Sequence, residues 1–505
     1  MEMNGGESLL RTLLAGGIEV CFTTPHVAGT GFAASLRRVP GIRAVAAIDE
    51  QIATGAANGY ARMAEKPVAT LLFPGPGLVL GEANLRNAAF AHLPIVNLVG
   101  DPARERRRRE RGSAPAIEEM VRGYSGWLRV SAGPKDLGRD AADAVLAART
   151  APGCVASLIV PEEALASESG RPAAIFNPPR APMPEAATIA RVAAALQRGE
   201  RAAILLGAVA SCTAALITAG RIAAATGASL LVPAEVRRIR RGAGLATIER
   251  IPPGPGAALR CLRRFRVLIL AGAQAPSPDP ADSPANEARA AETVTLAAPE
   301  EDAAGALEAL AVALSAHATT PFVEAERRPP ATRGPITGAG IAAVIGSLLP
   351  EWAVVADEAG PAGREIFREC RGAPPHDWVI GMDEPAGLGV ALAAGAAMAC
   401  PDRPVLCLTG EAGAVRALQA LGSVLREGRS VTVLVLADHG KAIPGMPEAE
   451  EQAPAPAASD PEPDRIALAE EMGVPGRRIE TLEALAEALR GGFAGGGPSL
   501  IEVPL

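Results

Sequence analysis

Short apolar runs alternate with Ala-rich segments of helical period along the whole of this 505-residue chain. The apolar runs are rich in Val, Ile and Leu, and most end in glycine, proline or acidic residues, as strands do. Strands that alternate with helices form parallel sheets covered by helices on both faces. The sequence therefore predicts an α/β protein built from doubly wound parallel sheets.

Two proline-rich stretches divide this pattern. Residues 175–184 and 319–335 contain too much proline for a helix or a central strand, and we interpret both as linkers. They predict three domains, over residues 1–170, 185–318 and 335–505. Only 3% of the residues are aromatic, so we expect the domain cores to consist of small aliphatic side chains.

Composition excludes several classes of protein. No run of about 18 uncharged apolar residues is present, so we expect no membrane span. The N-terminus is acidic and lacks the apolar core of a signal peptide, and seven scattered cysteines read as reduced thiols, so we expect a cytoplasmic protein. A net charge of −7 gives no general attraction to nucleic acid, and the Arg/Glu run at 104–111 is typical of a solvated helix face.

The stretch 404–441 predicts a strand at 405–408, a tight turn, a helix at 414–426 and a strand at 431–436. Glu411 and Asp438 follow the two strands, so both lie at the carboxyl edge of a parallel sheet, where α/β folds bind ligands. Two carboxylates there could share a hard cation such as Mg²⁺ with a diphosphate. The alternative is a pair of solvated loop acids.

This stretch resembles the diphosphate-binding motif of thiamin diphosphate (ThDP) enzymes, Gly-Asp-Gly followed after a fixed interval by Asn-Asn. Here Gly-Glu-Ala replaces the first triplet and Ala-Asp replaces the Asn pair, although the 27-residue interval suits the family. The resemblance implies that the metal ligands are Glu411, Asp438 and Gly440, and that Gly410, Ala412 and Gly413 bind the cofactor.

Residues 47–101 are similar to the pyrimidine-binding domain of the same family, with several features in the family's order. Glu50 stands where the family has its cofactor-activating glutamate, which shares a proton with the aminopyrimidine ring. Gly75 and Asn84 follow in stretches that the resemblance assigns to cofactor binding. Considered alone, Glu50 could equally be a carboxylate favoured by the dipole at the start of a helix.

Two further positions depend on the resemblance. His26 follows the first strand, where the family has a loop facing the substrate, so it could contact substrate or transfer a proton; an exposed loop histidine is the alternative. Ala386 and Gly387 fall in the turn that holds the aminopyrimidine, with Ala386 in the place of the bulky residue that bends the cofactor. Separately, Thr337 is expected to cap the helix that follows it.

The resemblance to acetolactate synthase and benzoylformate decarboxylase implies a ThDP- and Mg²⁺-dependent decarboxylase or carboligase acting on a small 2-oxo acid. It also implies a homodimer or homotetramer, because the family's sites are shared between chains. The altered motif leaves two alternatives: a relative that has lost the cofactor, and a subunit that lends Glu50 to an intact ThDP-enzyme partner. No Gly-x-Gly-x-x-Gly follows the strands of the middle domain, so we predict no FAD.

Overall fold

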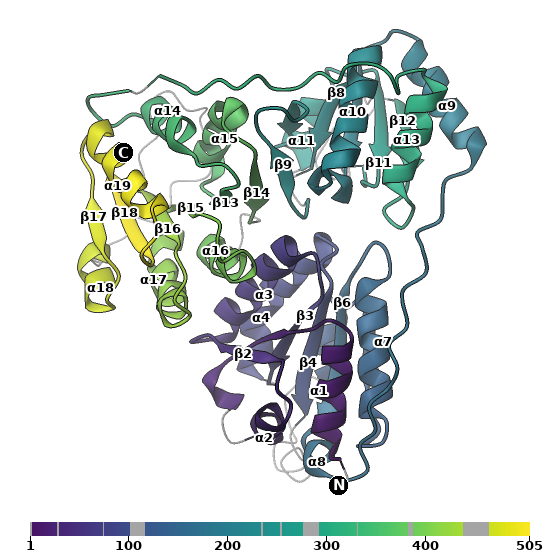
Figure 1. Cartoon of the computed structure of the whole chain (residues 1–505), viewed down its shortest axis with the longest axis vertical. Coiled ribbons are helices and arrows are strands. Elements are labelled where there is room, and N and C mark those ends of the chain that lie inside the picture. The colour runs from purple at the N-terminus through teal and green to yellow at the C-terminus, as the bar shows by residue number, and fades with distance from the viewer. Residues whose placement is uncertain are drawn as a thin grey trace.

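The computed structural model has three sheets of largely parallel strands, each covered by helices (Figure 1). This is the α/β architecture expected from the alternating pattern. The structure describes residues 3–27, 30–73, 75–101, 117–233, 236–252, 255–275, 292–330, 332–381, 387–437 and 464–504.

The first sheet has six parallel strands in the order β2-β1-β3-β4-β6-β5. Its central strands are buried along their whole length, as expected when helices cover both faces. The strands are β1 (Val20–Thr23), β2 (Arg43–Ala46), β3 (Val68–Leu72), β4 (Ile95–Asp101), β5 (Trp127–Val130) and β6 (Val155–Pro161). The helices are α1 (Gly5–Ala15), α2 (Gly31–Arg38), α3 (Glu50–Ala64), α4 (Pro76–Phe90), α6 (Ile117–Arg122), α7 (Leu137–Arg149) and α8 (Glu162–Ala166), with a 3-10 turn, η1 (Pro25–Val27).

The second sheet is smaller, with the parallel order β10-β8-β7-β11-β12. Its strands are β7 (Ala202–Leu206), β8 (Ser229–Val232), β10 (Ile248–Arg250), β11 (Val267–Ala271) and β12 (Glu292–Ala297). The surrounding helices are α9 (Ala186–Gln197), α10 (Thr213–Thr226), α11 (Pro255–Leu262) and α13 (Ala303–Ala313), with a 3-10 turn, η2 (Ala208–Ser211).

The third sheet has the order β17-β18-β16-β15-β13-β14-β9. Its strands are β13 (Val354–Glu358), β14 (His376–Ile380), β15 (Val405–Gly410), β16 (Thr432–Ala437), β17 (Gly476–Arg478) and β18 (Ser499–Pro504). Its helices are α14 (Gly338–Leu348), α15 (Gly360–Glu369), α16 (Leu388–Ala399), α17 (Glu411–Arg426), α18 (Arg465–Glu471) and α19 (Leu482–Phe493), with a 3-10 turn, η3 (Cys370–Gly372). The Thr337 side chain accepts a hydrogen bond from the Gly340 amide, which confirms the predicted cap.

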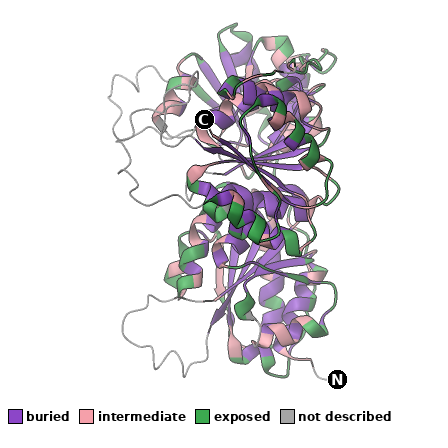
Figure 2. Ribbon diagram, turned by 90° about the vertical axis from the view of Figure 1, so that its left-hand side faces the viewer, coloured by how far each residue is buried: buried purple, intermediate pink, exposed green. Residues whose placement is uncertain are grey.

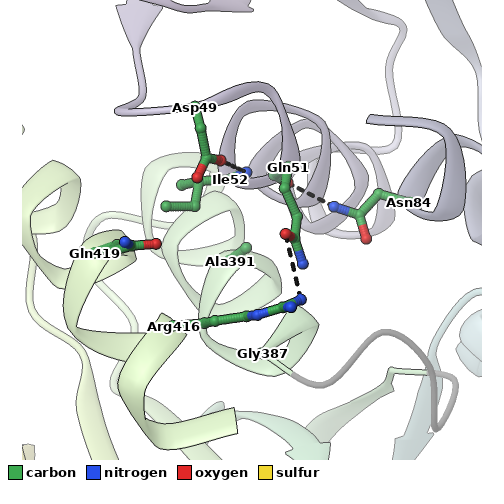
Figure 3. A pocket seen from close by; sticks show the side chains of 8 residues that line it. All are labelled: Asp49, Gln51, Ile52, Asn84, Gly387, Ala391, Arg416 and Gln419. Atoms are coloured by element: carbon green, nitrogen blue, oxygen red, sulfur yellow. Dashed lines mark hydrogen bonds between the residues drawn. The ribbon is translucent and has the colours of Figure 1, made fainter. Parts of the chain in front are cut away.

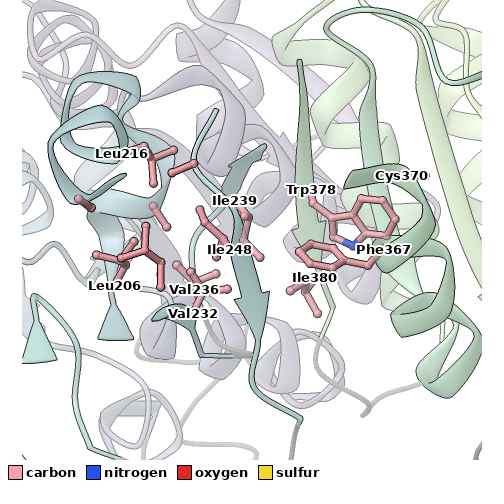
Figure 4. Close-up of a cluster of buried hydrophobic side chains, with 14 of the residues drawn as sticks. Leu206, Leu216, Val232, Val236, Ile239, Ile248, Phe367, Cys370, Trp378 and Ile380 are labelled. Atoms are coloured by element: carbon pink, nitrogen blue, oxygen red, sulfur yellow. The ribbon is translucent and has the colours of Figure 1, made fainter. Parts of the chain in front are cut away.

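The seventh strand of that sheet, β9 (Ile239–Arg241), comes from the middle of the chain and pairs antiparallel with β14. Ile239 and Ile248 on one side and Trp378 on the other belong to one buried cluster that runs between the second and third sheets (Figure 4). The middle region is thus tied to the third domain by a strand as well as by apolar contacts.

The first and third domains meet where α3 packs against α16. A Cβ added to Gly59 would lie 2.0 Å from the carbonyl oxygen of Leu392, and one added to Gly395 would lie 1.9 Å from that of Ala56. These glycines let the two backbones approach each other closely. Buried residues occupy this helix contact as well as the sheets (Figure 2).

One prediction about the third domain was wrong. The expected turn before 414 is the first turn of α17, which begins at Glu411. Gly410 adopts an extended conformation as the N-cap, and an acidic residue is favoured in the first turn by the helix dipole. Among the helices of the described ranges, none is both long and apolar enough to cross a bilayer.

Candidate functional site

Glu50 is a buried carboxyl at the carboxyl edge of the first sheet, and 7% of its surface is exposed. It is the first residue of α3, whose start is capped by the Asp49 side chain accepting from the Ile52 amide at 2.8 Å. A Cβ added to Gly77 would lie 2.7 Å from Oε1 of Glu50, so the glycine is what lets the first turn of α4 pack against the carboxyl.

Thr24 lies between Glu50 and His26 at the end of β1. Its hydroxyl is fully buried, 3.3 Å from Oε1 of Glu50 and 3.4 Å from Nδ1 of His26. The His26 ring itself is exposed in the turn η1. The structure therefore brings both predicted catalytic residues to one hydroxyl group.

A cavity lies at the start of α3, between the first and third domains (Figure 3). It encloses ≈ 410 Å³ with its open mouth and is lined by Gln51 and Asn84 of the first domain and by Gly387 and Arg416 of the third. Arg416 reaches across the cavity and donates to the Gln51 side chain at 3.4 Å. Two predicted cofactor-binding residues, Asn84 and Gly387, thus share one cavity although they are far apart in the sequence.

Asn84 has an acceptor without a protein donor in that cavity. Its side chain is fully buried, and its Nδ2 donates to the backbone oxygen of Gln51 at 2.5 Å and to the Thr54 hydroxyl at 3.2 Å. Among the described residues, none donates to its Oδ1. A buried acceptor of this kind is costly unless water or a ligand satisfies it.

Glu358, at the end of β13, occupies the N-terminus of α16. Its carboxylate accepts from the amides of Gly387 at 2.7 Å, Leu388 at 2.9 Å and Gly389 at 3.1 Å, and from the Thr409 hydroxyl at 3.1 Å. Burial raises the pKa of Glu358, and these donors oppose the rise. The nest of amides that would bind an external anion is therefore filled by a side chain of the same domain.

Glu411 starts α17 but is already paired. Its carboxylate accepts from Arg465 at 3.1 Å, and Arg465 also donates to the buried Glu502 at 2.7 Å. By contrast, the backbone beside Glu411 is open: Gly410 has no atom within 4 Å of an added Cβ, and Ala412 is exposed. The helix start can thus receive an anion, while the predicted metal ligand binds an arginine.

The other predicted positions divide into two groups. Gly75 has a positive φ of 89° with open space around it, whereas a Cβ on Gly413 would lie 2.3 Å from the Thr409 hydroxyl, so Gly413 serves the packing around Glu358. Ala386, Asp438 and Gly440 lie outside the described residues. Within the described ranges, no group of three or more His, Cys, Asp or Glu side chains could hold a metal ion.

Two family models match the domains that carry the candidate site. Residues 3–120 match the N-terminal TPP binding domain of thiamine pyrophosphate enzymes, and residues 364–503 match the C-terminal TPP binding domain. TPP is another name for ThDP. The chain belongs to the ThDP-dependent enzyme family.

Relatives within the ThDP-dependent family span the whole chain. A Mycobacterium tuberculosis (strain ATCC 25618 / H37Rv) protein named "Putative acetolactate synthase large subunit IlvX" is 37% identical over 512 residues, covering 99% of both chains. Benzoylformate decarboxylase of Pseudomonas aeruginosa is 29% identical over 36% of each chain. The structure of the Rhodococcus jostii RHA1 thiamine diphosphate-dependent 4-hydroxybenzoylformate decarboxylase matches the fold with a TM-score of 0.79 at 19% identity, covering 99% of both chains.

Several residues that the structure places at the candidate site were not predicted from the sequence. Glu358 was visible as a carboxylate at the end of a strand, which is the same pattern that marked Glu411 and Asp438. Thr24 and Arg465 carried no comparable signal, because a threonine after a strand and an arginine before a helix are common. Only the fold brings them to Glu50 and Glu411.

Proposed function

We propose that this chain is a ThDP-dependent lyase or transferase that decarboxylates a small 2-oxo acid, alone or with carboligation to an acceptor. The observation that carries the proposal is Glu50, a buried carboxyl at the start of α3 with Gly77 closed against it. The chain as a whole is similar to a protein named "Putative acetolactate synthase large subunit IlvX". The substrate class follows from that relative's printed name and from the decarboxylase relatives.

Part of the described site fits the cofactor. The pyrimidine ring requires a buried carboxyl, which Glu50 supplies, and Asn84, whose Oδ1 has no protein donor among the described residues, is hydrogen-bonded to the backbone of the next residue, Gln51. A diphosphate requires backbone amides, and the open start of α17 at Gly410 and Ala412 presents them together with the helix dipole.

The metal part fits less well. Glu411 is bound to Arg465, so a cation could use this carboxylate only after the ion pair opens. Any Mg²⁺ bound with the cofactor would therefore compete with Arg465 for this carboxylate. Arg465 is itself a cation beside the start of α17, and its guanidinium can offset part of a diphosphate's charge.

The residues of this chain have distinct tasks in the proposed reaction. ThDP, when bound, supplies an electron sink for the carbanion left by loss of CO₂. Glu50 holds and returns a proton at its carboxyl oxygens, and its burial keeps water from competing for that proton. Gly77 lets the start of α4 lie close to the carboxyl, and the start of α17 orients the anionic end of the ligand.

The proposal includes no flavin. In the middle domain a Cβ on Gly207 would lie 1.7 Å from the carbonyl oxygen of Gly272, so the ends of β7 and β11 are packed on each other where a dinucleotide would need room. A purified protein that releases FAD on denaturation would contradict this part.

Calorimetric titration with ThDP and Mg²⁺ tests the proposal directly. We expect wild-type protein to bind ThDP, and Glu50→Gln to keep its affinity while turnover of 2-oxo acids falls by about 10²–10⁴-fold, because an amide cannot exchange a proton with the ring. Gln51→Glu, which moves a carboxyl one position along α3, is the matched control and should not restore turnover to Glu50→Gln. Full turnover by Glu50→Gln would rule out the mechanism.

A second candidate function is a relative that no longer binds the cofactor. Two carboxylates favour it, because Glu358 fills the amide nest of α16 and Glu411 is neutralised by Arg465. Under this alternative wild-type protein binds no ThDP at millimolar concentration, and the cleft serves different chemistry, a partner, or an intact enzyme that receives Glu50. The same titration separates the two candidates.

A further inference from the structure

The buried Glu50 carboxyl is connected to solvent by two side chains at the end of β1. Thr24 Oγ1 lies 3.3 Å from Glu50 Oε1 and 3.4 Å from His26 Nδ1, and only the histidine is exposed. Both distances are longer than the usual range of hydrogen bonds, about 2.5–3.0 Å for O–H···O and about 2.7–3.2 Å between nitrogen and oxygen. Such contacts in sites without ligand commonly tighten when the ligand binds.

The donors and acceptors of the three groups determine which group donates in each of the two hydrogen bonds. A hydroxyl has one proton to donate, and an ionised carboxylate only accepts. When Glu50 is ionised, Thr24 donates to Glu50 and must accept from His26, so Nδ1 of His26 carries the hydrogen. When Glu50 is protonated, Thr24 accepts from Glu50 and donates to a bare Nδ1. The tautomer of His26 therefore follows the protonation of Glu50.

We propose that Thr24 and His26 form a proton relay that connects Glu50 with solvent. In the inward direction His26, doubly protonated, gives the Nδ1 proton to the Thr24 oxygen while the Thr24 proton passes to Oε1 of Glu50. This leaves a neutral histidine, an unchanged hydroxyl and a neutral carboxyl. The outward direction reverses both transfers, so one proton moves and no bond other than O–H and N–H changes.

The arrangement around Glu50 explains why a relay is useful. Gly77 covers the carboxyl, and Thr54, the nearest other hydroxyl in α3, donates to the backbone oxygens of Glu50 and Gln51 instead of the carboxyl. Within the described part of the chain, Thr24 is thus the hydroxyl that reaches the Glu50 side chain. The catalytic role of the relay rests on the proposed function, whereas its contacts are present without a cofactor.

Nitrogen NMR of the cofactor-free protein tests the relay without any turnover. The chain has five histidines, so the His26 signals can be assigned by their loss in His26→Ala. With Glu50 ionised, we expect wild type to show the Nδ1–H tautomer. Thr24→Val, which removes the hydroxyl and keeps the shape, should shift His26 to the Nε2–H tautomer, and Thr24→Ser should restore Nδ1–H. An unchanged tautomer in Thr24→Val would overturn the proposal.

Turnover provides the second measurement. Thr24→Val and His26→Ala should each slow decarboxylation by about tenfold or more, below the full effect of a positioned acid–base group, with ThDP affinity unchanged. Because His26 is exposed, added imidazole should restore activity to His26→Ala but not to Thr24→Val. Imidazole rescue of neither variant, or of both equally, would contradict the relay.

The proposed function and the relay can be disproved independently of each other. If wild type binds no ThDP, the proposed function is lost, yet the tautomer shift still decides whether the three groups are coupled. If ThDP binds and Glu50→Gln is inactive while Thr24→Val keeps full turnover, the function stands and the relay does not.

Discussion

His376 shows how strongly position controls the chemistry of a single side chain here. The ring is fully buried on β14, its Nδ1 bonds the backbone oxygen of Pro374 at 2.8 Å, and Arg241 of β9 lies close by. Burial, together with the positive charge of Arg241, lowers the pKa of His376 to about 3. The folded protein therefore keeps this histidine neutral at pH values where an unfolded chain would protonate it.

This difference makes stability depend on pH. The unfolded chain binds a proton below its ordinary pKa of about 6.5, whereas folded His376 does not until about pH 3. The contribution of His376 to the free energy of unfolding is therefore fully present above the pKa of the unfolded chain. It is lost as the pH falls from that pKa toward the folded one, at on the order of 1.4 kcal/mol per pH unit. His376→Phe should remove that contribution. We expect the free energy of unfolding of wild type, minus that of the variant, to decrease steadily from neutral pH to acid in denaturant titrations; a constant difference would contradict it.

Individual site residues were predictable where a motif placed them and not where the fold did. Glu50 was found because several matches surround it, and the structure places it at a buried carboxyl edge. The pairing of Glu411 with Arg465 could not be foreseen, because 54 residues separate them and the pattern of each helix and strand does not report contacts over that distance. Whether Glu50 and Glu411 have the roles implied by the family stays a prediction.

At the scale of elements, the contact between α3 and α16 depends on two glycines. The helices approach so closely at Gly59 and Gly395 that each added Cβ would overlap a carbonyl of the other helix. Backbone atoms cannot move aside as a flexible side chain can, so the helices must separate to admit a methyl group. This contact sets the spacing between the first and third domains and hence the cavity beside Asn84.

Gly395→Ala should therefore destabilise the protein by about 3 kcal/mol, as overpacking of a tight core does. Gly491→Ala in α19 is the control, because its Cβ would meet nothing within 4 Å. There the replacement should stabilise by up to about 1 kcal/mol through helix propensity. Thermal unfolding of both variants measures this contrast, and equal shifts of the same sign would show that the helix contact is less tight than described.

The sequence predicted the parallel-sheet architecture well and its mixed edge poorly. The alternation of strands and helices was sufficient for the α/β fold, since periodicity reports how each segment is buried. Strand β9 was missed because Ile239–Arg241 has a single apolar residue between arginines. Its pairing with β14 depends on partners from another domain, which no local pattern reports.

At the scale of the whole molecule, one arginine-rich segment joins all three domains. Arg237 donates to the backbone oxygen of His92 in the first domain, and Arg238 pairs with Glu65 there. Arg238 and Arg240 also lie 3.5 and 3.2 Å from Asp377 in the third domain. Asp377 is fully buried; although burial opposes it, these arginines and Arg403 lower the pKa of Asp377.

Replacing Asp377 by Ala should cost about 3–5 kcal/mol, because it leaves buried Arg238 beside a neutral group. Glu292→Ala is the control, since its pair with Arg198 is exposed on both sides and should contribute nothing measurable. Denaturant unfolding followed by tryptophan fluorescence and by circular dichroism would show whether the domains separate first. A small effect of Asp377→Ala would mean that the arginines are satisfied elsewhere.

We also expect the protein to be a homodimer or a dimer of dimers. Val79 and Phe90 of α4 are 60% and 59% exposed and lie on one side of the helix, three turns apart. A second copy is the occupant that we expect, because the family resemblance implies sites shared between chains. Sedimentation should show a dimer at micromolar concentration, with Val79→Asp/Phe90→Asp shifting it to monomer. Phe176→Asp, which changes an exposed residue of the linker, is the control and should leave the protein dimeric. A wild-type protein that sediments as a monomer would contradict this prediction.

Strand β9 also has a consequence for how the chain matures on the ribosome. It leaves the exit tunnel long before its partner β14, and at ordinary rates of translation the delay is on the order of ten seconds. During that interval the middle domain can form its own five strands, but β9 has nothing to pair with. The last domain, made without the middle one, would in turn present β14 as a bare edge, which invites aggregation. Gene fragments that end or begin at the second linker should therefore yield aggregation-prone protein, although each encodes a sheet of its own.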